Sequence, residues 1–104
     1  MTGGLREKDL QIICEVLKRF ADVDEAILFG SRAKGNYQPG SDVDLALKGQ
    51  ALSPTIARIS GCLNDESPLP YRFDIIDYHG LTNDELREHI DRVGVIVYRR
   101  ELRR

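Results

Sequence analysis

The stretch LFGSRAKGNYQPGSDVDLAL, residues 28–47, contains the features that decide the fold of this chain. Its last five residues, 43–47, form a largely apolar run that predicts a strand, yet Asp44 lies within this run and Asp42 lies directly before it. Side chains alternate between the faces of a strand, so both carboxylates should point the same way. Like charges this close repel, which pushes one of them toward its protonated form unless a cation lies between them.

Gly30 and Ser31 stand where a predicted strand, residues 25–29, gives way to a short helix, residues 31–34, closed by Gly35. Exposed N–H groups and the helix dipole at such a junction suit an anion such as phosphate. The alternative is a plain strand-to-helix turn with Ser31 as the N-cap. The pattern is not a Walker A loop, because GxxxxGK[ST] does not occur.

The composition of the chain is that of an ordinary globular protein. Its 104 residues, 41% hydrophobic and 31% charged, predict a single domain over 1–104. A net charge of −2 argues against a general nucleic-acid binder. No apolar run approaches the roughly 18 residues of a membrane span and no signal-peptide pattern occurs, so a cytoplasmic location is expected. Cys14 and Cys62 lack metal-type or CxxC spacing and are expected to be buried free thiols.

Apolar periodicity predicts helices and strands in alternation. Helices are expected over residues 5–20, 31–34, from 53 through 63, and 82–92, and strands over residues 25–29, 42–48, 71–76 and 95–98. This order favours the α/β (α+β) class, with a small mixed sheet of about four strands flanked by helices.

The paired aspartates indicate a metal site. Carboxylate oxygens suit Mg²⁺, which is commonly bound together with substrate phosphates. A third ligand is expected on a neighbouring strand, where Asp74 and Asp77 are the choices. If Phe73 and Ile75 face the helices, Asp74 points to the opposite surface, as Asp42 and Asp44 do. Parity therefore favours Asp74, and Asp77 is interpreted as a strand-end or turn residue. The loop suited to phosphate and the carboxylates suited to metal together predict a nucleoside-triphosphate site.

The pattern G-S-x(10)-D-x-D-L, followed by a third aspartate on a later strand, resembles the nucleotidyltransferase superfamily that includes DNA polymerase beta. The short chain, with GSRAKG and SDVDLAL, looks like the minimal nucleotidyltransferase (MNT) family, whose members are partners of HEPN-domain proteins. The resemblance extends from Ile27 to Tyr98 and implies a nucleotidyltransferase fold. The family motif is present without departure, which favours an active enzyme.

The resemblance also implies roles for individual residues. Gly30 and Ser31 would hold the β- and γ-phosphates of a nucleotide triphosphate, Asp42 and Asp44 would ligate two Mg²⁺ ions, and Asp74 would ligate the metal that activates the acceptor hydroxyl. The implied reaction moves a nucleoside monophosphate, expected to be AMP from ATP, to a hydroxyl of a HEPN protein. The chain would then be an antitoxin. Two alternatives stay open: a non-catalytic binding antitoxin or chaperone, and the catalytic subunit of a small-molecule nucleotidyltransferase.

Further residues near the motif are candidates of lower specificity. Arg32 and Ser41 are assigned to nucleotide binding, with a solvated helix face as the alternative for Arg32. Tyr37 either stacks on a base or packs in its loop. His79 and His89 lack metal-ligand spacing and are interpreted as surface residues.

Overall fold

The computed structural model describes residues 2–50 and 52–101, and helices and strands alternate along them. The elements are α1 (Glu7–Lys18), β1 (Val23–Phe29), α2 (Gly30–Lys34), β2 (Val43–Gly49), α3 (Ser53–Gly61), β3 (Phe73–Asp77), α4 (Asp84–Val93) and β4 (Val95–Arg99). A π-helical turn, η1 (Cys62–Glu66), extends α3, and a 3-10 turn, η2 (Tyr78–Gly80), follows β3.

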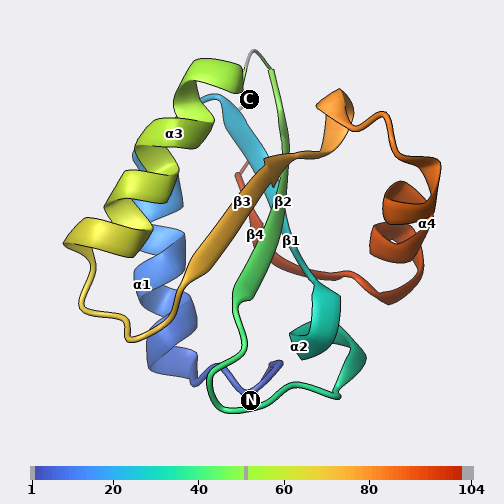
Figure 1. Cartoon of the computed structure of the whole chain (residues 1–104). Helices are drawn as coiled ribbons and strands as arrows, with labels where there is room; N and C mark the ends of the chain where they lie inside the picture. The colour runs from blue at the N-terminus through green and yellow to red at the C-terminus, as the bar shows by residue number, and fades with distance from the viewer. Residues whose placement is uncertain (1, 51, 102–104) are drawn as a thin grey trace.

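The four strands form one mixed sheet in the order β3-β2-β1-β4 (Figure 1). The inner strand β1 is antiparallel to both β2 and β4, whereas the other inner strand, β2, is parallel to β3. The predicted mixed sheet of four strands flanked by helices is therefore confirmed. The parallel pair is connected through α3, because a parallel connection needs a crossover rather than a tight turn.

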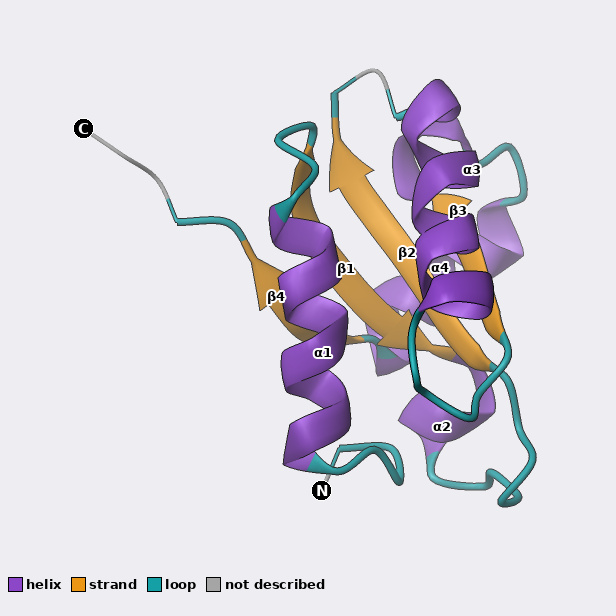
Figure 2. Ribbon diagram, turned by 90° about the vertical axis from the view of Figure 1, so that its left-hand side faces the viewer, coloured by secondary structure: helices purple, strands orange, loops and turns teal. Residues whose placement is uncertain are grey.

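Two helices cover one face of the sheet. Figures 1 and 2 show α1 and α3 side by side on this face. Their apolar stripes meet inward-facing strand residues in the main core, which includes Ile13, Leu17, Leu28, Leu45, Ile59, Leu63, Phe73 and Ile75. Phe73 and Ile75 thus face the helices, as the parity argument assumed.

The opposite face is covered only in part. A smaller cluster of Ile27, Phe29, Ala46 and Ile90 packs there beneath α4. Because strand residues alternate, the consecutive buried run from Ala26 to Phe29 indicates that β1 is covered on both faces. Asp44 and Asp74 alternate with the residues that face α1 and α3, so they lie on this second face together with Ala46 and Ile76.

Element boundaries differ from the predicted ones by one or two residues at several points. β2 begins at Val43, so Asp42 precedes the strand, and β3 begins at Phe73. The cap of α4 is Asn83, whose side chain accepts a hydrogen bond from the Leu86 N–H at 3.1 Å. Within the described ranges, no helix has the length and apolar character required to cross a membrane.

Candidate active site

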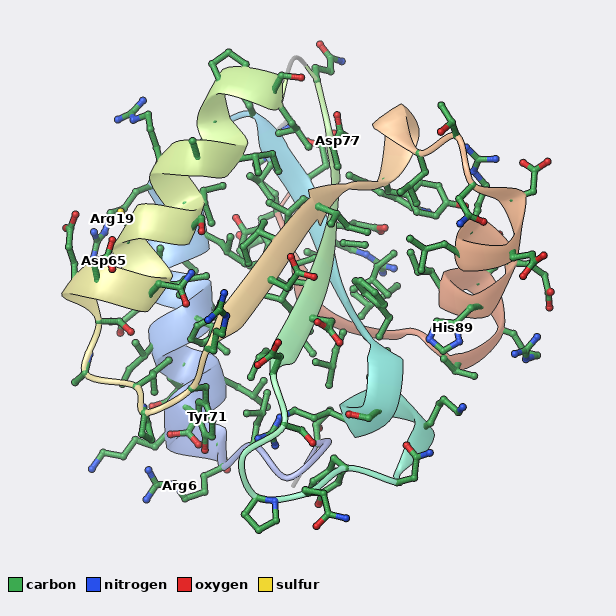
Figure 3. The ribbon with its side chains drawn as sticks, in the orientation of Figure 1. Arg6, Arg19, Asp65, Tyr71, Asp77 and His89 are labelled. Carbon is green, nitrogen blue, oxygen red and sulfur yellow. The ribbon has the colours of Figure 1, made fainter. Side chains whose placement is uncertain are left out.

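The strand register brings the predicted carboxylates together. Asp44 on β2 pairs with Asp74 on β3, and adjacent strands are about 4.8 Å apart. Asp44 also pairs with Phe29 at the end of β1, so Gly30 follows directly beside it. Asp77 pairs with Leu47, three residues further along, and its carboxylate accepts a hydrogen bond from the His79 N–H at 3.1 Å. Asp74 is therefore near Asp44. Asp77 caps a turn at the far end of β3 (Figure 3).

The electrostatic state of Asp44 reflects this crowding. Its pKa is raised from 3.8 to about 6, first by burial, then by the negative charge of Asp74 and finally by that of Asp42. All three carboxylates are thus close enough to interact. The repulsion expected from the spacing of Asp42 and Asp44 is present, and Asp74 adds to it.

Gly30 lies against the Asp44 carboxylate. Its backbone is in the left-handed region, with φ +76°. A Cβ atom at this position would lie 2.2 Å from Asp44 Oδ2. The left-handed backbone therefore favours glycine, and any larger residue would also displace the Asp44 carboxylate. This close approach connects the turn after β1 physically to the carboxylates on β2.

Ser31 is the second residue of α2 rather than its cap. The helix begins at Gly30, and its N-cap residue is Phe29, which makes no side-chain capping bond. The Ser31 carbonyl accepts from the Gly35 and Asn36 N–H groups, at 3.0 and 3.2 Å, and closes the helix. The alternative of a turn capped by the Ser31 side chain is therefore wrong.

His89 contacts the turn directly, which the sequence interpretation missed. Its Nε2 atom accepts a hydrogen bond from the Gly30 N–H at 3.1 Å, across 59 positions of sequence. The side chain is half-buried at the side of α4 that faces α2 (Figure 3). The interpretation of His89 as a surface residue is wrong. A signal was available, because His89 lies three residues after Leu86 and next to buried Ile90, on the apolar side of α4.

Arg32 has a different role from either of those expected. Its side chain is only 3% exposed. The guanidinium donates to the backbone carbonyls of Gly3, at 2.8 Å, and of Ser41, at 3.0 and 3.2 Å. Its donors are thus directed to backbone carbonyls inside the protein, away from solvent. We correct the nucleotide-binding assignment: Arg32 holds the loop that leads to Asp42.

Aromatic rings and a second polar network enclose Arg32. Its guanidinium lies 5.2 Å from the ring centre of Tyr37 and 5.0 Å from that of Tyr71. Tyr37 therefore packs within its loop. The Tyr71 hydroxyl donates to Asp9 on α1 at 2.7 Å, and Arg6 pairs with the same carboxylate (Figure 3). Through Tyr71 and Asp9, these contacts connect the loop between α2 and β2 to helix α1.

Ser41 contributes to the same loop. Its hydroxyl accepts a hydrogen bond from the Gln38 N–H at 2.8 Å, and its carbonyl is the main acceptor for Arg32. These contacts order the backbone immediately before Asp42. The nucleotide-binding assignment of Ser41 stays a prediction.

Asn64 fixes the edge of β3 just before Asp74. Its amide oxygen accepts from the Phe73 N–H at 2.7 Å, and its amide nitrogen donates to the Phe73 carbonyl at 3.1 Å. The side chain, on the π-helical turn η1, thus pairs with an outer backbone position of an edge strand. An open hollow of about 490 Å³ adjoins this contact and includes Asp74 and Arg72 in its lining.

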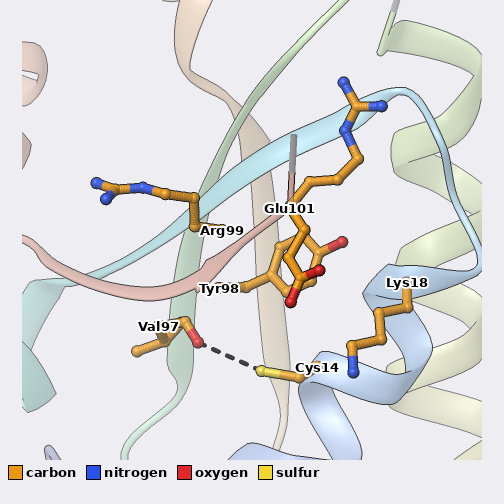
Figure 4. Close-up of a pocket in the computed structure, with 7 residues that line it drawn as sticks. Cys14, Lys18, Val97, Tyr98, Arg99 and Glu101 are labelled. Atoms are coloured by element: carbon orange, nitrogen blue, oxygen red, sulfur yellow. Dashed lines mark hydrogen bonds between the residues drawn. The ribbon is translucent and has the colours of Figure 1, made fainter. Parts of the chain in front are cut away.

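Another hollow, of about 880 Å³, is on the other edge of the sheet, between α1 and β4 (Figure 4). The Cys14 thiol donates to the Val97 carbonyl there at 3.3 Å, and burial raises the pKa of that thiol. A raised pKa disfavours a reactive thiolate. Cys14 and Cys62 are both free, as predicted, but both are half-buried rather than buried.

The donor set at the carboxylates consists of oxygens only, which suits a hard divalent cation such as Mg²⁺. Across residues 2–50 and 52–101, no three His, Cys, Asp or Glu side chains already enclose a position for a metal ion. Asp42, Asp44 and Asp74 therefore interact through space without converging on one point. Burial first, and then the negative charges of Asp74 and Asp42, raise the pKa of Asp44, and a bound cation would compensate those charges.

The family of the chain follows from comparison with known proteins. The model of the family "Polymerase beta, Nucleotidyltransferase" matches residues 11–103, which span the turn at Gly30, the carboxylates and all four strands. The chain belongs to this nucleotidyltransferase family. It is a nucleotidyltransferase of the MNT type, as the sequence motif predicted.

Individual relatives agree with this assignment. The chain is 30% identical over 99 residues to the probable protein adenylyltransferase MntA of Haemophilus influenzae, covering 93% of this chain and 85% of that protein. Two crystal structures share its fold. One is a toxin-antitoxin with AMP-PNP, with a TM-score of 0.70, 18% identity and coverage of 92% of this chain and 76% of that one. The other is the toxin-antitoxin MntA-HepT, with a TM-score of 0.68, 16% identity and coverage of 91% and 74%.

Proposed function

We propose that this chain transfers AMP from ATP, with Mg²⁺, to a hydroxyl group of a partner protein, and that it is the antitoxin of a toxin-antitoxin pair. The observation that carries the proposal is the packing of Gly30 against Asp44, in a register that pairs Asp44 with Asp74. A turn suited to phosphate and an acidic cluster suited to metal are thus one continuous surface. Similarity to a protein adenylyltransferase supports AMP as the transferred group and a protein as the acceptor.

Each residue has a stated part in the proposed site. Gly30 lets the phosphates approach the backbone closely, and the Ser31 hydroxyl donates to a phosphate oxygen. Asp42, Asp44 and Asp74 would hold divalent cations, which neutralise charge on the triphosphate and on the attacking and leaving oxygens. In the strand order, Asp44 on β2 lies between the Gly30 turn at the end of β1 and Asp74 on β3, so a triphosphate bound at that turn would have its phosphates on the β1 side.

This order gives the reaction a direction across the sheet. In-line displacement requires the acceptor oxygen to attack the α-phosphorus opposite the departing pyrophosphate. The bond from the acceptor oxygen to phosphorus forms, the bond between the α-phosphorus and its bridging oxygen breaks, and pyrophosphate leaves with the electron pair. The acceptor proton passes to the Asp74 carboxylate. With phosphates beside β1, the acceptor approaches from the β3 side.

The space on that side fits a side chain carried by another molecule. The hollow beside Asp74 has a volume of about 490 Å³ and opens at the edge strand β3. Positioning of the acceptor supplies much of the catalysis in such reactions, so a docked partner would have to hold the hydroxyl in place. Similarity in fold to toxin-antitoxin complexes, one of them MntA-HepT, supports a HEPN-type toxin as that partner.

Transfer of label from ATP tests the proposal. The chain is co-expressed with the product of its neighbouring gene, and the purified pair is incubated with Mg²⁺ and ATP labelled at the α-phosphate. We expect the partner to become labelled by ATP that carries the label at its α-phosphate. We expect no label on the partner when ATP is labelled at the γ-phosphate instead, and none when the chain is the Asp44→Asn variant. Stable complex formation with no transfer of α-label would instead favour an antitoxin that acts by binding alone. Label on a small molecule would favour the subunit of a small-molecule transferase.

A further inference from the structure

His89 holds the turn at Gly30 through the backbone N–H of that residue. Its Nε2 atom accepts the Gly30 N–H at 3.1 Å, which requires a neutral imidazole with its proton on Nδ1. The ring also meets Phe29 edge to face, with 6.2 Å between ring centres. The imidazole is therefore fixed by one polar and one aromatic contact, both with the last two residues before Ser31.

Gly30 needs such an external contact because glycine is the most flexible residue. It occupies left-handed and right-handed regions about equally, so its own sterics do not select the φ of +76° found here. The bond to His89 fixes the N–H of Gly30, and the carboxylate of Asp44 lies where a Cβ atom of this residue would be. The direction of the following peptide, which carries the Ser31 N–H, depends on this choice.

We propose that His89 is a positioning residue for nucleotide binding: through the Gly30 N–H it sets the peptide that presents Ser31 to the triphosphate. The inference rests on the proposed function, because Ser31 is there the phosphate contact. It also changes the role of Gly30 in the proposed site, because the N–H of Gly30 donates to His89 within the protein. The contribution of Gly30 to phosphate binding is then close approach, and the polar contacts come from Ser31. Helix α4 thereby becomes part of the nucleotide site although it contains no phosphate contact itself.

Two substitutions of His89 distinguish the effect of its hydrogen bond to Gly30 from the effect of its packing against Phe29. His89→Gln keeps an acceptor that can reach the Gly30 N–H, whereas His89→Phe keeps a ring beside Phe29 and removes the acceptor. Binding of AMP-PNP with Mg²⁺ is measured by calorimetry, which needs neither partner nor turnover. Because one hydrogen bond and the order of the turn are lost, we expect His89→Phe to raise Kd about tenfold and His89→Gln to stay within about threefold of wild type. His79→Phe, at an exposed position after β3, is the matched control and should bind as wild type does.

Each outcome decides the inference. Equal or tighter binding by His89→Phe would overturn it, and so would an equal loss in both variants, because packing alone would then explain the effect. Absence of AMP-PNP binding by the wild-type protein would overturn the proposed function as well, which distinguishes the two failures. A second measurement needs no substitution: the through-bond NMR coupling between the Gly30 amide nitrogen and His89 Nε2 should persist when AMP-PNP and Mg²⁺ are added. Loss of that coupling would mean that the nucleotide displaces His89, contrary to a positioning role.

Discussion

Replacement of Asp44 by asparagine should stabilise the protein at pH 8 and change its stability little at pH 4. The pKa of Asp44 in the folded state, about 6, lies above its ordinary value of 3.8. The folded protein therefore binds the proton more tightly than the unfolded chain does, and the free energy of unfolding falls as pH rises through this window. An asparagine side chain cannot ionise, so the free energy of unfolding of the Asp44→Asn variant does not fall for this reason as pH rises.

The size of the effect follows from the difference between the two pKa values. At about 1.36 kcal/mol per pKa unit, a rise from 3.8 to about 6 corresponds to about 3 kcal/mol. Asp44 is half-buried, and solvent screening reduces the value to about 1–2 kcal/mol. Since about 1 kcal/mol moves the Tm of a domain of this size by about 4–8 °C, the gain is measurable.

The assay is denaturant unfolding of wild type and variant at a series of pH values from 4 to 8. We expect the difference in unfolding free energy to grow from near zero at pH 4 to its full value above pH 6. Asp77→Asn makes the same chemical change three residues beyond Asp74 and should bring no gain at pH 8. Parallel curves for wild type and Asp44→Asn across the whole range would refute the reasoning.

Three further changes test other parts of the site. Asp74→Asn should eliminate label transfer while Asp77→Asn retains it, and the reverse result would mean that the functional face of β3 is misassigned. Ser31→Ala should raise the Kd for AMP-PNP about ten- to a hundredfold through loss of a hydrogen bond to a charged phosphate, so unchanged binding would return Ser31 to a structural role. Arg32→Lys should lower the free energy of unfolding by about 2–4 kcal/mol in denaturant titration, because an ammonium group cannot reproduce the planar donors that meet Gly3 and Ser41; a loss under about 0.5 kcal/mol would contradict that role.

Local patterns in the sequence were sufficient to predict the sheet and the acidic cluster. Alternation of apolar and acidic residues fixes which way a strand side chain points, once one face is known to be buried. Phe73 and Ile75 are buried, so Asp74 had to face the other way, and the structure pairs it with Asp44. Repulsion between Asp42 and Asp44 was likewise a consequence of spacing alone.

Contacts between segments that are distant in the sequence could not be predicted from such local patterns. The bond from Gly30 to His89 joins residues far apart in the chain, and no periodicity encodes it. Arg32 was expected to face a nucleotide or solvent because it lies on a short polar helix, yet its partners are carbonyls of an irregular loop and of the N-terminal turn. The positions of loop carbonyls depend on the whole fold, so a buried arginine of this kind cannot be recognised from its neighbours in sequence.

Intact mass spectrometry of the chain and its co-purified partner, after incubation with ATP and Mg²⁺, tests the central proposal most directly. We expect the partner to gain the mass of one AMP or of a whole number of AMP groups, the chain itself to keep its mass, and the pair made with Asp44→Asn to stay unmodified. An unmodified partner in a wild-type complex that binds ATP and Mg²⁺ would contradict adenylyl transfer as the function of this site.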